Sequence, residues 1–235
     1  MITVQLEPTS LNELEAGLDL TKKESRAVLK GAINKAAVDI EKRMQKEIRG
    51  RYQMSSKTRG RVRGSFNLKR AKVGNLTATI KVESRIGELY NFKVTPNTYY
   101  PGGKGAPKKG LKAKVEKKSN MKRLVLHDDK PGDTIDYAKR VNELINSQRS
   151  GYKAFVVKYK SGHIAVAQRI HGEEATNAMH GKKKAEKIKN LYSPSITKMG
   201  EVVYMQEIDG LVADDILTNA MTEQVEKLLA KKGSV

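Results

Sequence analysis

Histidine and serine residues are the first candidates for chemistry in this sequence. His163, His171 and His180 lie within eighteen residues, but none has the His-Glu-x-x-His spacing that places two metal ligands on one helix face. Ser193 and Ser195 lack the Gly-x-Ser-x-Gly turn that exposes a nucleophilic serine. We therefore expect no metal site and no serine nucleophile.

Phosphate-binding loops and carboxylate pairs are the next candidates. The segment Gly102-Gly-Lys-Gly105 has neither the spacing of a nucleotide-binding P-loop nor the Ser or Thr that follows its lysine. The acidic pairs Asp128-Asp129 and Asp214-Asp215 are adjacent in sequence, and such neighbours seldom converge on one substrate. We predict that the protein is not an enzyme and has no cofactor.

Positive charge is the most informative feature of the composition. The chain has 46 Lys and Arg against 26 Asp and Glu, which gives a net charge of +20. Residues 42–74 hold twelve bases and one acid, whereas residues 201–226 hold seven acids and no base. Such asymmetry is typical of a protein that binds nucleic acid or of a subunit that stacks on copies of itself. It is equally typical of a solvated surface whose charge keeps the protein in solution.

The most concentrated basic segment is Arg59-Gly-Arg-Val-Arg-Gly64, which is similar to the Arg/Gly tracts that follow phosphate backbones. Aromatic residues are sparse around it, with only Tyr52 and Phe66 nearby, so the same segment is equally suited to an acidic protein neighbour. The candidate DNA- or neighbour-contacting residues are Arg49, Arg51, Arg59, Arg61, Arg63, Lys108 and Lys109.

Composition also bears on the cellular setting. The chain has no Cys, which excludes disulfide scaffolds and thiol catalysis and is typical of synthesis in a reducing cytoplasm. No apolar run approaches the roughly 20 residues needed to cross a bilayer. The first twenty residues carry four acids and no base, unlike a secretory signal. We expect no membrane partner.

The amino-terminal half predicts a long helix followed by strands. Apolar residues recur at intervals of three and four through residues 22–48, opposite a charged face, as in an amphipathic helix. Residues 50–65 show no apolar period and are predicted to be a basic arm without regular structure. Alternating apolar residues predict strands at 66–70, 76–82, 90–94 and 111–115, with a flexible loop at 97–110.

The carboxy-terminal half predicts an inserted helix, a hairpin and a final helix. An inserted segment at residues 127–150 is expected to hold a helix near 135–146. Two apolar runs flank Lys160-Ser-Gly162 and predict a hairpin over 154–170. A polar loop is expected at 171–187 and a helix at 211–229. The fold class is therefore α+β, with the long amino-terminal helix packed on a mainly antiparallel sheet in a single domain over residues 1–235.

The order of several short motifs resembles the lambda-type prophage minor tail protein Z family, the tail completion proteins of long-tailed bacteriophages. The resemblance covers about residues 25–230. It departs from the family pattern in the segment 127–150, in the long loop 171–187, and at Ser193, where Gly is common. The motifs that carry it are Gly31-Ala-Ile-Asn-Lys-Ala-Ala37, Arg51-Tyr52, Phe66-Asn-Leu-Lys-Arg-Ala71, Leu76-Thr-Ala-Thr-Ile-Lys-Val82, Ala154-Phe155, Lys160-Ser-Gly-His-Ile164, Gln168-Arg169 and Leu191-Tyr-Ser-Pro-Ser195.

The resemblance implies a structural virion protein, made in the host cytoplasm, that completes the head-proximal end of a phage tail and helps join tail to head. It implies a homo-oligomeric ring, six-fold to match the tail tube, which contacts the tail tube or tail terminator and neck proteins. Non-specific contact with genomic DNA is also expected. The alternative is a stand-alone protein that binds nucleic acid without sequence preference.

Overall fold

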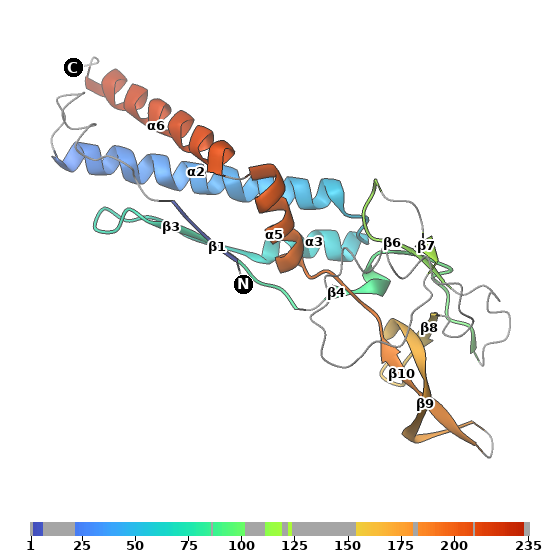
Figure 1. Cartoon of the computed structure of the whole chain (residues 1–235). Coiled ribbons are helices and arrows are strands. Elements are labelled where there is room, and N and C mark those ends of the chain that lie inside the picture. The colour runs from blue at the N-terminus through green and yellow to red at the C-terminus, as the bar shows by residue number, and fades with distance from the viewer. Residues whose placement is uncertain are drawn as a thin grey trace. The chain divides into compact units, whose positions relative to one another are not determined.

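The computed structural model describes residues 2–6, 22–85, 87–101, 111–118, 122–123, 154–180, 183–208 and 210–232. Helices and antiparallel strand pairs are both present, so the predicted α+β class is confirmed (Figure 1). The chain forms two compact units, a first unit of residues 1–50, 60–84 and 196–235 and a second unit of residues 51–59 and 85–195. The single domain over residues 1–235 stays a prediction.

The long helix α2 (Lys22–Arg51) organises the first unit and confirms the helix expected at 22–48. Its apolar positions follow the helical repeat, which brings them onto one side that is removed from water. Leu29 is 1% exposed, and Ile33, Ile40, Met44 and Ile48 are each 0% exposed.

The carboxy-terminal helix α6 (Gly210–Lys232) runs antiparallel to α2 along most of its length (Figure 1). Lys35 of α2 forms an ion pair with Glu223, and Lys232 pairs with Glu24 at 3.1 Å. A Cβ atom at Gly31 would lie 2.7 Å from the side-chain oxygen of Gln224, so the Gln224 side chain of α6 packs over this glycine of α2.

Helix α6 confirms the helix expected at 211–229 but buries only some of its apolar residues. Leu217 is buried, but Leu211 is 78% exposed and Leu229 is 49% exposed. The buried stripe runs instead through Ala213, Leu217 and Ala220, because small side chains let α6 approach its neighbours closely. The short helix α5 (Ile196–Val203) and the turn η3 (Tyr204–Ile208), which precede α6, were not anticipated.

A three-stranded antiparallel sheet completes the first unit. Its order is β1-β3-β2, with β1 at Ile2–Leu6, β2 at Phe66–Lys69 and β3 at Ala78–Val82. Central strand β3 buries alternate residues completely, at Ala78, Ile80 and Val82. Figure 1 shows α2 between this sheet and α6.

The second unit consists of small antiparallel sheets. Strand β4 (Gly87–Glu88) pairs with β11 (Tyr192–Ser193). Strands β5 (Lys93–Thr95), β6 (Lys112–Lys114) and β7 (Lys122–Arg123) form a second sheet. Strands β8 (Phe155–Lys158), β9 (Ile164–His180) and β10 (Lys183–Asn190) form a third.

Two expectations for the second unit are corrected by these strands. The polar loop expected at residues 171–187 is wrong, because β9 and β10 pair with each other through most of this segment. Inter-strand backbone hydrogen bonds impose extended structure even where no apolar alternation marks it. The strand expected at 90–94 begins only at Lys93, because the 3-10 turn η1 (Leu89–Asn91) precedes it. The hairpin predicted over 154–170 is confirmed, with Gly162 at φ +82° in its turn.

The arm expected at residues 50–65 is also wrong. It contains the helix α3 (Ser56–Gly64). Ser55 caps this helix, since its Oγ accepts a hydrogen bond from the Thr58 N–H at 3.3 Å. Thr58 and Val62, one turn apart, are 9% and 0% exposed. A single buried turn is too short to register as an apolar period.

Two further expectations cannot be compared with the structure. The inserted segment 127–150 with its helix at 135–146 lies outside the described residues, and the loop 97–110 is described only as far as residue 101. Within the described part of the chain, no helix combines the length and the apolar character that a membrane crossing requires.

Candidate functional site

Helix α3 displays the basic residues that the sequence singled out. Arg59, Arg61 and Arg63 are all exposed, as is Lys57. At 100° per residue, Lys57 and Arg61 lie on one side of the buried Thr58–Val62 stripe, and Arg59 and Arg63 lie on the other. The helix therefore presents positive charge on both sides of its buried stripe.

The two arginines that precede α3 differ from the three on it. The Nε of Arg51 lies 3.2 Å from Oε1 of Glu116, and its guanidinium carbon lies 5.8 Å from the centre of the Tyr52 ring. Arg49 is only partly exposed, on α2. Arg51 is thus engaged within its own unit, whereas Arg59, Arg61 and Arg63 are directed to solvent. Lys108 and Lys109 lie outside the described residues.

The segment around Tyr52 is fixed to residues 115–117 by its backbone. The Gln53 N–H donates to the Val115 carbonyl at 2.7 Å, and the Lys117 N–H donates to the Arg51 carbonyl at 2.8 Å. The Tyr52 side chain is 3% exposed. Burial raises the pKa of Tyr52 to about 12, with Arg51 opposing the shift and Glu116 adding to it. This buried tyrosine anchors the chain just before α3.

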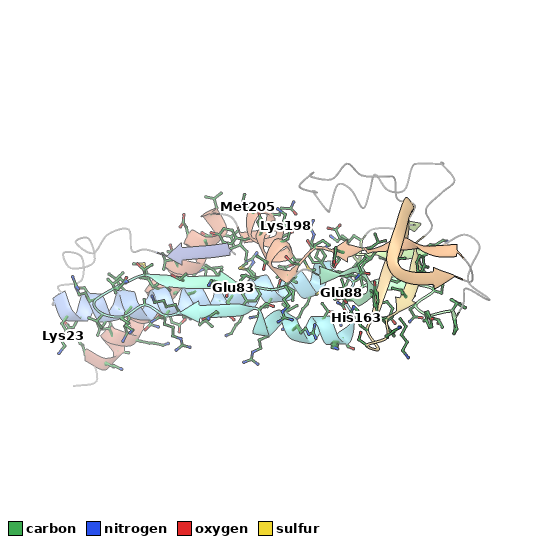
Figure 2. The ribbon with its side chains drawn as sticks, turned by 90° about the horizontal axis from the view of Figure 1, so that it is seen from below. Lys23, Glu83, Glu88, His163, Lys198 and Met205 are labelled. Carbon is green, nitrogen blue, oxygen red and sulfur yellow. The ribbon has the colours of Figure 1, made fainter. Side chains whose placement is uncertain are left out.

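The histidine cluster considered from sequence has a different role at the one member whose side chain is described. His163 lies beside Glu88 (Figure 2), with its Nε2 3.2 Å from Oε1 of Glu88. The imidazole stacks on the Tyr159 ring, with ring centroids 5.9 Å apart. These contacts join the β8–β9 turn to β4 within the second unit. Among the described residues, no group of three or more His, Cys, Asp or Glu side chains could hold a metal ion.

The acidic segment 201–226 lies on α5, η3 and α6 of the first unit. We call its exposed acids, Glu201, Glu207, Asp214, Asp215 and Glu226, the acidic set. Two large apolar side chains are exposed in the same segment, Leu211 at 78% and Met205 at 71%. Met205 is labelled in Figure 2.

A second set of exposed charges on the first unit has the opposite sign. We call Arg61, Arg63, Lys69, Arg70 and Lys72, on α3 and on β2 and the turn that follows it, the basic set. Val73 is 44% exposed beside it, in the turn that the Lys72–Asn75 backbone hydrogen bonds close. The first unit therefore offers both signs of charge, each with an exposed apolar side chain.

Sequence reasoning missed one arrangement of lysines in the second unit. Lys93, Lys112 and Lys114 come from two strands that are neighbours in the β5-β6-β7 sheet. The alternation of lysine with Leu111, Ala113 and Val115 was the available signal, since alternate residues of a strand share a face. Only the strand register brings Lys93 into the same set.

Comparison with protein-family models, with curated proteins and with solved structures finds no match to this chain.

Proposed function

We propose that this chain is a structural virion protein, a ring subunit that completes the head-proximal end of a phage tail and helps join tail to head. The proposal rests on the ordered motifs of the tail completion family together with the charge arrangement of the first unit. The acidic set and the basic set on one unit are the observation that carries it.

A ring subunit needs two different surfaces that complement each other. In a head-to-tail ring each copy presents one surface to the copy ahead and the other to the copy behind. The acidic set with Met205 and Leu211, and the basic set with Val73, meet that requirement in charge and in apolar character. Charge complementarity of this kind sets the orientation and the rate of association.

The alternative function is non-specific nucleic-acid binding, and the exposure of Lys57, Arg59, Arg61 and Arg63 on α3 favours it. One feature favours assembly over this alternative, because the chain carries its own acidic complement in the acidic set. Phosphate contact is therefore the second candidate for α3.

The function is tested by locating the protein in virions. An antibody against the purified chain, applied to phage particles from the source cells, is expected to label the junction of head and tail. Label elsewhere on the particle, or its absence from particles, overturns the proposal.

The ring is tested separately by charge reversal. Replacing all five acids of the acidic set by Lys makes both surfaces basic, and replacing all five bases of the basic set by Glu makes both acidic. Each variant alone is expected to stay monomeric in sedimentation, because like charges oppose each other. An equimolar mixture is expected to assemble with the two variants alternating. Assembly of either variant alone as well as the unchanged chain contradicts this arrangement.

A further inference from the structure

We infer that the β5–β6 sheet of the second unit carries a separate binding surface for the phosphate backbone of DNA, formed by Lys93, Lys112 and Lys114. This set is called the lysine face. It belongs to the second unit, which contains neither the acidic set nor the basic set. The inference goes beyond the proposed function, since it requires neither a ring nor a virion.

The strand register places the three lysines on one side of the sheet. Lys93 lies directly opposite Lys114, and Thr95 lies opposite Lys112. Opposite residues of an antiparallel pair share a face, as do residues two apart on one strand. Val94 and Ala113 occupy the other face, at 6% and 2% exposed. One side of the sheet is thus core, and the other is lysine and threonine.

This arrangement is unfavourable unless an anion covers it. Like charges directly opposite each other destabilise a strand pair, and Lys93 faces Lys114 without an intervening acid. Within the described residues no carboxylate forms an ion pair with any of the three lysines. Their charge is therefore not offset by any carboxylate in the described part of the chain.

Protection of a sheet edge explains only part of the lysine face. Lysine on an edge strand commonly prevents pairing with another chain, and Lys93 lies on the edge strand β5. Lys112, however, lies on the central strand β6 and is paired on both sides, opposite Thr95 of β5 and Arg123 of β7. Its exposed side chain contributes nothing to edge protection.

The spacing suits a polyanion better than a single small anion. Lys112 and Lys114 are separated by about 6.6 Å along the strand, from a rise of about 3.3 Å per residue. Each ammonium is a compact charge on a flexible stem and can contact a phosphate of its own. A repeating phosphate backbone offers several anions in a row, so DNA is the ligand that fits.

The test measures binding of the full chain to a 30-base-pair duplex of random sequence at several salt concentrations. The triple variant Lys93→Gln, Lys112→Gln, Lys114→Gln is compared with Lys42→Gln, Lys46→Gln, Lys231→Gln, which removes three exposed lysines from the first unit. The lysine-face variant is expected to lower the slope of log affinity against log salt by up to about 2.7. Its affinity should fall roughly tenfold to hundredfold at 0.15 M salt.

A second variant separates binding from folding. Lys93→Glu places an acid opposite Lys114, so the melting temperature should rise while DNA affinity falls further than with Lys93→Gln. Equal losses in the lysine-face and control triples would assign binding to overall charge and overturn the inference. Unchanged DNA binding with loss of association between copies would assign the face to an acidic protein and also overturn it. Sedimentation of the same variants measures ring assembly. The DNA-binding inference and the ring proposal are therefore tested independently of each other.

Discussion

Asn34 on α2 and Ala71, just after β2, form a reciprocal pair of hydrogen bonds. The Asn34 Nδ2 donates to the Ala71 carbonyl at 3.1 Å, and Asn34 Oδ1 accepts from the Ala71 N–H at 2.7 Å. Both residues belong to motifs that the resemblance rests on, although 37 positions separate them. The contact holds α2 against the edge of the sheet. It therefore gives both motifs one structural role, which is to join α2 to β2.

Replacing Asn34 should destabilise the first unit. Asn34→Ala removes both partners of the Ala71 backbone, and we expect a loss of about 1–3 kcal/mol in the free energy of unfolding. Urea unfolding of the full chain measures it. Asn67→Ala, at an exposed position of β2, is the control and should stay within about 0.5 kcal/mol. Equal losses at the two positions would remove the special role of Asn34.

Gly87 allows the Ser193–Pro194 segment to pass close to β4. A Cβ atom there would lie 2.5 Å from the Pro194 carbonyl oxygen and 2.5 Å from the Ser193 Oγ. We expect Gly87→Ala to cost about 1–3 kcal/mol, because the backbone must move. Gly60→Ala on α3 meets nothing within 4 Å and should stabilise by about 0.4–1 kcal/mol. Thermal unfolding that ranks the two variants the other way would contradict this packing.

The three arginines of α3 should act in assembly. Replacing Arg59, Arg61 and Arg63 by Ser is expected to weaken self-association in sedimentation, with the salt slope of DNA binding unchanged. The control replaces Lys42, Arg43 and Lys46 of α2, which are also exposed, by Ser. This control is expected to keep its self-association. A fall of up to about 2.7 in the salt slope with intact assembly would instead make α3 a DNA contact. No change in either property would leave α3 as a solvated surface.

Tyr52 should make stability fall at high pH. Its pKa is about 12 in the folded protein against an ordinary 10.0, so the folded state holds the phenol proton more tightly. The stability that this provides is present below pH 10 and is lost as the pH rises from 10 to 12. Tyr52→Phe should therefore show a smaller decline across that window in urea unfolding. Parallel declines in the two proteins would show that Tyr52 does not contribute.

Local patterns were sufficient where one element buries one face. The repeat of Leu29, Ile33, Ile40 and Met44 predicts α2, and each of these residues is buried. The alternation in residues 76–82 likewise predicts β3, and the apolar runs around Gly162 predict the β8–β9 hairpin. In each case the apolar period is long enough to identify the element by itself.

The sequence alone determined the charge asymmetry of the chain, its long helix and the choice of Arg59, Arg61 and Arg63 as candidates. Only the tertiary structure decided that the α3 bases lie on a capped helix, that Arg51 is engaged with Glu116, and that Lys93 lies opposite Lys114. The physical reason is the range of the interactions. Helical and strand periods act over a few residues, whereas ion pairs and strand register join residues far apart in the chain, as with Arg51 and Glu116, 65 positions apart.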